Sequence, residues 1–259
     1  MSMQLILEII EKKLKHHYQI NFMINNVKKN LLIFFGELRT FEYIIPKLKK
    51  LDEVDIIVST WMESKRNDGI IQVDENIIRQ IYPNVKHCNI IDFNQIEDFD
   101  LKNNSWKIYY HWKSVINNLN ADEYDNVIFH RCDFFSNWDS ILDLDIEDDT
   151  IYLHSEEYSK PHFKDNPSVF WVNDYYFFGK FNIVKKFINF FNKEHKTSSH
   201  FDMWEVISQN NIKFKNFILK GTLIKDNNIE GMKDTAMGAV DMGFLVGAGN
   251  GERTPFLNT

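Results

Sequence analysis

The chain has 259 residues, of which 44% are hydrophobic and 15% aromatic, so it is long enough to bury a large core in one main domain. Its net charge of −7, with no long stripe of lysine or arginine, argues against binding to duplex nucleic acid, because such binding needs many phosphates to be neutralised. The two cysteines, Cys88 and Cys132, are too few for a disulfide framework and lack the spacing of metal ligands.

Signals for membrane insertion and export are missing from the sequence. It contains no run of about 18 apolar residues, the length that a transmembrane helix needs. The N-terminus has no charged start followed by an apolar centre and a small-residue cleavage site. We therefore expect a cytoplasmic protein without a transmembrane segment.

The first predicted element is an amphipathic helix over residues 3 to 18. Its apolar residues recur at helical spacing, and Glu8 and several lysines lie on the other side. Packing against the main domain is one interpretation of the apolar face, and contact with a membrane surface or a partner protein is the other. An exposed apolar helix would also favour a homo-oligomer.

A strand, helix and strand follow, which is the start of an α/β fold. The strands are continuous apolar runs, as expected for a parallel sheet that is covered on both faces. A further strand, a helix and a third apolar strand continue the alternation. The predicted ranges are Leu31–Phe35, Thr40–Lys50, Val54–Ser59, Val85–Ile91, Trp106–Leu119 and Asn126–His130.

After Asp133 the alternation is less regular. We predict strands over Thr150–Leu153 and Phe214–Leu219 and helices over Phe181–Phe191 and Phe201–Gln209. Seven of the ten glycines fall between Gly221 and Gly251, which indicates a mobile tail or a lid over a site. The predicted organisation is an N-terminal helical extension over 1–30, a main domain over 31–220 and a glycine-rich tail over 221–259.

Two candidate site segments lie directly after predicted strands. Gly36 would let the backbone approach a ligand closely, and Arg39 in the next turn could hold a phosphate; a tight turn with a surface arginine is the alternative. Arg131 and Asp133 follow the third apolar strand. A guanidinium and a carboxylate at that point could bind a diphosphate, with or without Mg²⁺ or Mn²⁺, or could form a simple salt bridge.

Two further candidates lie in the second half of the chain. Asp174 is surrounded by aromatic residues, which offer flat faces to a sugar or base and tend to raise a carboxyl pKa towards a value that suits a general base. A turn between two strands is the alternative for Asn173 and Asp174. His200 precedes a helix and could cap it, with Asp202 and Glu205 as acids of the first turn.

Taken in order, these segments resemble GT-A-type nucleotide-sugar glycosyltransferase-like proteins of viruses and bacteria. The family motif SGQxRTF corresponds to FFGELRTF at Phe34–Phe41, and a strand ending in Ser or His, Thr and Trp corresponds to Ser59–Trp61. The motif YDxVIRxRxDL corresponds to Tyr124–Phe134, and nDxFfxG to Asn173–Gly179. A helix start of the form H/P-x-x-x-E corresponds loosely to His200–Glu205.

The chain departs from the family pattern at two positions. Glu37 replaces a glutamine and would repel a phosphate. The acid-x-acid metal motif of GT-A enzymes is present as Arg131, Cys132 and Asp133, so that one carboxylate has become a cation. Arg131 could itself offset the charge of a departing diphosphate, which leaves the use of Mn²⁺ or Mg²⁺ open.

The resemblance implies a GT-A-like α/β fold and the transfer of a sugar from a nucleoside diphosphate sugar to an acceptor hydroxyl on a glycan, protein or small molecule. It also implies roles for seven residues: nucleotide contacts for Gly36, Arg39, Thr60 and Arg131, metal contacts for Asp133 and His200, and catalysis by Asp174. One alternative is a catalytically inactive nucleotide- or glycan-binding module with the same fold. Another is a structural protein that recruits a partner through the helix at residues 3 to 18.

Overall fold

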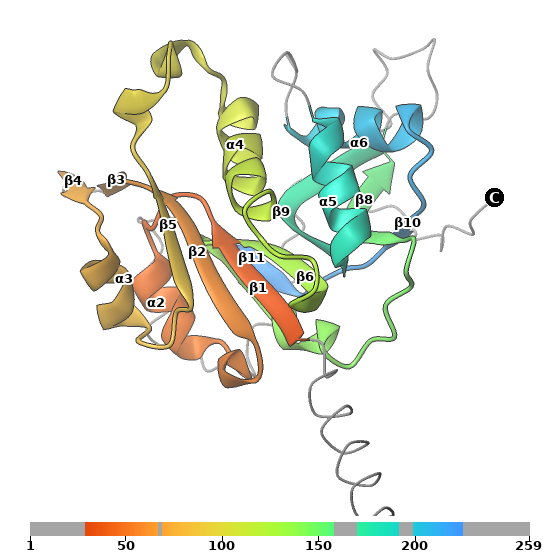
Figure 1. Ribbon diagram of the computed structural model, residues 1–259, viewed down its shortest axis with the longest axis horizontal. Coiled ribbons are helices and arrows are strands. Elements are labelled where there is room, and N and C mark those ends of the chain that lie inside the picture. The colour runs from red at the N-terminus through yellow and green to blue at the C-terminus, as the bar shows by residue number, and fades with distance from the viewer. Residues whose placement is uncertain (1–28, 67–68, 158–169, 192–198, 225–259) are drawn as a thin grey trace, which may run out of the picture.

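The computed structural model describes residues 29–66, 69–157, 170–191 and 199–224. Its centre is a seven-stranded sheet with the order β10-β8-β9-β6-β1-β2-β5 (Figure 1). Within the described part of this sheet, β9 alone runs against the other strands. The strands are β1 (Lys29–Phe35), β2 (Asp55–Trp61), β5 (His87–Ile91), β6 (Tyr124–Arg131), β8 (Ile151–Glu157), β9 (Phe170–Lys180) and β10 (Phe214–Asn216).

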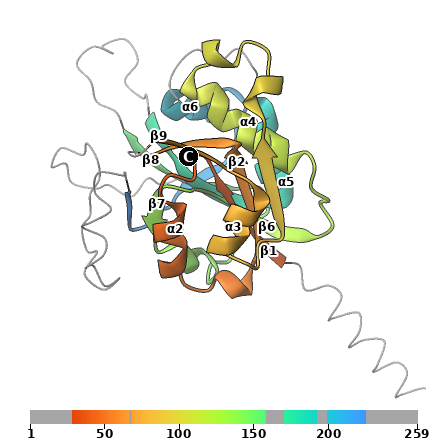
Figure 2. The same cartoon turned by 90° about the vertical axis from the view of Figure 1, so that its left-hand side faces the viewer.

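Helices cover both faces of the sheet (Figure 2). On one face lie α4 (Asn104–Ile116), α5 (Phe181–Phe190) and α6 (Ser199–Gln209), and on the other lie α2 (Phe41–Ile44) and α3 (Glu75–Ile81). The predicted α/β class, a mostly parallel sheet flanked by helices, is therefore confirmed. Among the described ranges, no helix is both long enough and apolar enough to span a bilayer.

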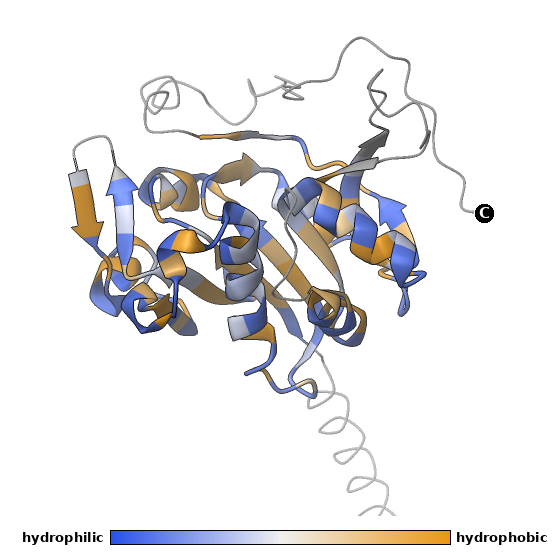
Figure 3. Cartoon of the chain, turned by 90° about the horizontal axis from the view of Figure 1, so that it is seen from above, coloured by the Kyte–Doolittle hydropathy of each residue, from blue (hydrophilic) through white to orange (hydrophobic). Residues whose placement is uncertain are grey.

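The apolar runs of the sequence are explained by this two-sided cover. In β1, Leu31, Ile33 and Phe35 pack towards α4, α5 and α6, whereas Leu32 and Phe34 pack towards α2 and α3. Successive side chains of a strand point to opposite faces, so a strand with helices on both sides must be apolar throughout. Figure 3 shows the resulting hydrophobic band along the strands in the middle of the molecule.

Two small sheets accompany the central one. β3 (Glu63–Arg66) and β4 (Gly69–Gln72) form an antiparallel pair, and so do β7 (Phe134–Ser136) and β11 (Gly221–Leu223). Gly221 is required by close packing in β11, since a Cβ there would lie 2.4 Å from the carbonyl oxygen of Phe135. The fold therefore continues to Ile224, past the predicted boundary at 220. The predicted N-terminal helix and residues 225–259 lie outside the described ranges.

Several element boundaries differ from the predictions. The predicted helix over 40–50 is the short α2 followed by a 3₁₀ turn at Ile45–Lys47, because Pro46 cannot donate a backbone hydrogen bond inside a helix. β2 extends to Trp61 and β6 to Arg131, further than predicted. The interpretation of Asn173 and Asp174 as a turn is wrong, because both lie within the eleven-residue strand β9.

Candidate functional site

The order in which strands are added to the sheet reverses between β1 and β6. From β1 the chain proceeds outwards to β2 and β5, and then returns to place β6 on the other side of β1. In open α/β sheets, ligands bind outside the carboxyl ends of the strands at such a switch point. In this chain the two strands end at Phe35 and Arg131, which are partners in the parallel pairing.

Gly36 forms the bend directly after β1. Its φ of 106° lies in the region that favours glycine, and its N–H donates to the carbonyl of Ser59 at 3.0 Å. Apart from its two chain neighbours, no heavy atom of the described residues lies within 4 Å of the position that a Cβ would occupy. Backbone is therefore exposed to close approach at the bend, next to the end of β6.

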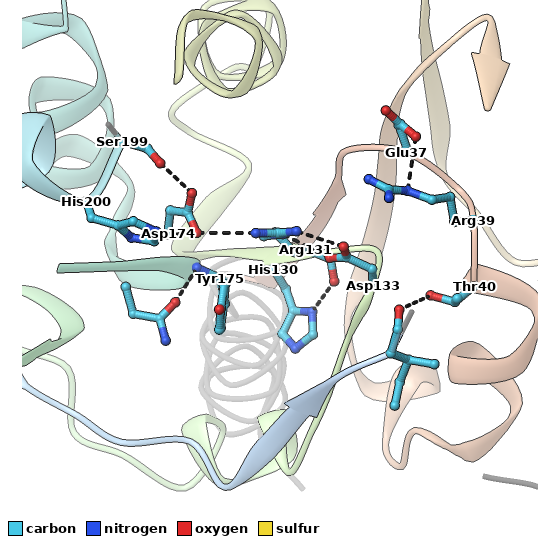
Figure 4. A network of polar contacts seen from close by, with 12 residues as sticks. Glu37, Arg39, Thr40, His130, Arg131, Asp133, Asp174, Tyr175, Ser199 and His200 are labelled. Carbon is cyan, nitrogen blue, oxygen red and sulfur yellow. Dashed lines mark hydrogen bonds and ion pairs between the residues drawn. The ribbon is translucent and has the colours of Figure 1, made fainter. Parts of the chain in front are cut away.

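Arg131 is held by two carboxylates at the carboxyl end of β6 (Figure 4). Its Nε and Nη2 donate to the two oxygens of Asp133 at 2.9 and 2.7 Å, and its Nη1 donates to Oδ1 of Asp174 at 3.3 Å. The guanidinium also lies over the ring of Tyr175, 5.0 Å from its centroid. We call Arg131, Asp133 and Asp174 the arginine cluster.

The arginine cluster is partly exposed to solvent, unlike a fully buried salt bridge. The side chain of Arg131 is 23% exposed and that of Asp133 is 16% exposed, whereas that of Asp174 is 4% exposed. Burial disfavours the charge on the guanidinium, but Asp133 and Asp174 outweigh this effect and raise the pKa of Arg131 above its ordinary value. Arg131 therefore remains a cation that a ligand at the sheet edge can reach.

Asp174 connects the arginine cluster to α6. Its Oδ2 accepts a hydrogen bond from Oγ of Ser199 at 2.6 Å, and its Oδ1 lies 4.0 Å from Nδ1 of His200. That nitrogen is 2.8 Å from the carbonyl oxygen of Val172. Because a carbonyl can only accept, His200 carries its proton on Nδ1 and donates it there.

Two of the predicted nucleotide contacts lie apart from the arginine cluster. Thr60 is fully buried inside β2, and its hydroxyl lies 3.4 Å from the carbonyl of Trp61, so it does not reach the strand end. Arg39 forms an ion pair with Glu37 at 3.0 Å. That pair neutralises the glutamate that departs from the family motif, and it engages the guanidinium through Nε, while the side chain of Arg39 is 42% exposed.

The residues proposed for Mn²⁺ or Mg²⁺ do not fit such an ion in this arrangement. Both oxygens of Asp133 accept N–H groups of Arg131, and the cationic guanidinium stands between Asp133 and the Asp174–His200 contact. Within the described ranges, no three His, Cys, Asp or Glu side chains gather as metal ligands. Asp133 and His200, the predicted metal ligands, are therefore not brought together.

Ser199 is a site residue that the sequence did not indicate. It is 6% exposed and bonds directly to Asp174, yet a serine before a helix reads as an ordinary cap. Its neighbour His200 was the available signal. Tyr109 and Asp202 form a second buried pair, at 2.9 Å between hydroxyl and carboxylate, on the α4 and α6 side of Asp174.

His130 precedes Arg131 in β6, and its burial makes the stability of the protein depend on pH. It is fully buried, donates from Nδ1 to the carbonyl of Arg131 at 2.9 Å and lies 2.8 Å from Oγ of Ser136 through Nε2. Burial lowers its pKa to about 4, below the value of about 6.5 in an unfolded chain. The contribution of His130 to the free energy of unfolding is therefore fully present above pH ~6.5, and it is lost as the pH falls towards 4.

When the pH falls from 7 to 5, we expect the wild type to lose about 2 kcal/mol of unfolding free energy through protonation of His130 on unfolding. His130→Gln should lack this loss. Urea unfolding at the two pH values measures this difference. His87→Gln, at an exposed position of β5, is the control and should leave the wild-type difference unchanged. Equal pH dependence in wild type and His130→Gln would contradict the assignment.

Comparison with known proteins gives distant structural matches. No protein-family model and no curated protein matches the sequence. The 4-diphosphocytidyl-2C-methyl-D-erythritol synthase from Anaerococcus prevotii matches at 11% identity and a TM-score of 0.47, over 79% of this chain and 96% of that one. The galactosyltransferase LgtC, solved with donor and acceptor sugar analogues, matches at 12% identity and 0.41, over 79% and 70%.

The glycosyltransferase GlyE from Streptococcus pneumoniae matches at 11% identity and a TM-score of 0.41, over 74% of this chain and 45% of GlyE. The chain therefore spans less than half the length of that enzyme. All three matches concern the backbone arrangement alone, and all three have TM-scores below 0.5. They are too distant for an activity to be transferred.

Proposed function

We propose that this chain is a glycosyltransferase that moves a sugar from a nucleoside diphosphate sugar to an acceptor hydroxyl. The observation that carries the proposal is the partly exposed guanidinium of Arg131 at the switch point of the sheet, beside the open bend at Gly36. The sequence resemblance to GT-A-type enzymes names the donor class. The acceptor is a hydroxyl of a glycan, a protein or a small molecule.

Arg131 is the proposed contact for the diphosphate. A guanidinium has five N–H groups, of which three point to Asp133 and Asp174. The other two, one on each terminal nitrogen, have no acceptor among the described residues and can donate to phosphate oxygens. In the transfer, the bond from the anomeric carbon to the diphosphate oxygen breaks and the acceptor oxygen bonds to that carbon. Arg131 would stabilise the charge that develops on the diphosphate.

Asp174 is proposed as the group that faces the acceptor or the reacting sugar. Its oxygens are engaged by Arg131 and Ser199, and its side chain is 4% exposed. To take the acceptor proton, it must first exchange one of these partners for the acceptor hydroxyl. In the arrangement described here, Asp174 holds Arg131 in place.

The charge of the arginine cluster supports a second candidate, a glycan-binding module. One guanidinium and two carboxylates leave a formal charge of −1, which does not attract a diphosphate. Carboxylate acceptors, a guanidinium donor and the ring of Tyr175 are groups that can bind the hydroxyls and the apolar face of a neutral sugar. Under this candidate the chain binds a glycan and transfers nothing.

Ligand binding and turnover together test the proposal. We expect a nucleoside diphosphate sugar of the UDP, GDP or CDP series to raise the melting temperature, to bind in isothermal titration, and to be consumed when acceptor is added. Each measurement is repeated with EDTA and with Mn²⁺ to determine the metal dependence. Binding of neutral glycans without turnover would favour the module. A lack of binding to either class would contradict both candidates.

A further inference from the structure

The first turn of α6 is fastened to β9 by two adjacent side chains. Ser199 donates to Oδ2 of Asp174 at 2.6 Å, and His200 donates to the carbonyl of Val172 at 2.8 Å. Ser199 and Asp174 are 6% and 3% exposed, so little water is available to replace their hydrogen bond. The start of α6 thus fixes the carboxylate at its place in β9.

The two oxygens of Asp174 have different hydrogen-bond partners, so each of them contacts a different part of the site. Oδ2 faces Ser199, while Oδ1 accepts from Nη1 of Arg131 at 3.3 Å (Figure 4). The contact with Arg131 is longer than the two contacts that Arg131 makes with Asp133. A carboxylate that lost its hydrogen bond at Oδ2 could turn about its last side-chain bond and withdraw Oδ1 from the guanidinium.

We propose that Ser199 is a positioning residue that sets the direction of the Arg131 guanidinium through Asp174. The inference rests on the proposed function in that Arg131 is the group that meets the ligand. Two carboxylates hold the guanidinium, and one of them is oriented by α6. The two remaining N–H groups of Arg131 are thereby kept pointing in one direction, which lowers the cost of ordering them when a ligand binds.

The test uses Ser199→Ala and Ser199→Thr in the full chain, with Ser208→Ala as the matched control. Ser208 lies on the exposed side of the same helix, where its hydroxyl donates to the carbonyl of Glu205. We expect Ser199→Ala to weaken nucleotide-sugar binding about tenfold, and Ser199→Thr, which keeps the hydroxyl, to remain within about twofold of wild type. Ser208→Ala should bind as wild type does.

A double-mutant cycle separates positioning from simple loss of structure. In an Arg131→Ala background, Ser199→Ala should have no further effect on binding, because the group that it positions is gone. Equal losses in both backgrounds, or a failure of threonine to restore binding in a chain that melts at the wild-type temperature, would overturn the proposal. If the wild type binds no nucleotide sugar, the proposed function fails instead, and the same cycle measured on the unfolding free energy still tests the coupling.

Discussion

Arg131→Ala is expected to lower sugar transfer by about a hundredfold or more, the scale found when a group that stabilises developing charge is removed. The variant loses the cation at the switch point and leaves Asp133 and Asp174 facing each other without it. Breaking a fully buried ion pair costs about 3 to 5 kcal/mol of stability. Because the side chain of Arg131 is 23% exposed, we expect a smaller loss of about 1 to 3 kcal/mol.

Two further variants show whether the geometry or the charge of Arg131 is responsible for the expected loss of transfer. Arg131→Lys keeps the charge but replaces a planar fork by a single ammonium, which cannot reproduce the paired contact with Asp133. Its transfer rate should lie between those of wild type and Arg131→Ala. Arg79→Ala removes a half-buried arginine of α3 that pairs with Glu75 at 2.7 Å, and it should transfer as wild type does. Steady-state transfer assays and urea unfolding measure both quantities, and full transfer by Arg131→Ala would disprove the assigned role.

The sequence was sufficient for the central strands because their physical signature is local. A strand with helices on both faces has to be apolar at every position, and β1, β2 and β6 are visible as continuous runs for that reason. Arg131 stood out because it ends such a run. A site at the strand ends was also expected, because Gly36 and Arg131 directly follow predicted strands.

Strand β9 shows where local patterns are insufficient. A buried carboxylate in the middle of an apolar strand carries a large desolvation penalty unless it is paired, and the sequence alone left a turn open as the alternative for Asp174. Its partners, Arg131 and Ser199, lie 43 and 25 positions away in the chain. Strand β11 also could not be predicted from a local pattern. Its pairing with β7 depends on close packing at Gly221, which leaves no periodic pattern of apolar residues in the sequence.

Thr60 illustrates the sensitivity of a site prediction to one strand boundary. Assigned to the end of a strand, it was expected to face a nucleotide. β2 continues to Trp61 and pairs Thr60 with Ile90 of β5, and the side chain of Thr60 is fully buried. A shift of two residues in the end of the strand therefore moves a polar side chain from the edge of the sheet into its interior.

Asp133→Asn distinguishes an anionic donor from a neutral glycan. The substitution changes the formal charge of the arginine cluster from −1 to 0, while the amide oxygen can still accept one N–H of Arg131. If the ligand is a nucleoside diphosphate sugar bound directly by Arg131, removal of the nearby negative charge should tighten binding by about fivefold, or roughly 1 kcal/mol. If the ligand is a neutral glycan, the loss of a carboxylate acceptor should weaken binding instead.

A divalent cation would give a third outcome in the same experiment. A site in which Asp133 binds Mn²⁺ or Mg²⁺ would lose donor binding in Asp133→Asn, and the wild type would lose it in EDTA. Asp143→Asn is the matched control, because it makes the same change in total charge at a side chain that is 77% exposed and paired with Lys50. Isothermal titration of all three proteins with nucleotide sugar and with glycan, with and without EDTA, therefore assigns Asp133 from the direction of the change. Tighter donor binding in Asp133→Asn that EDTA does not alter is the result expected if Arg131 supplies the positive charge.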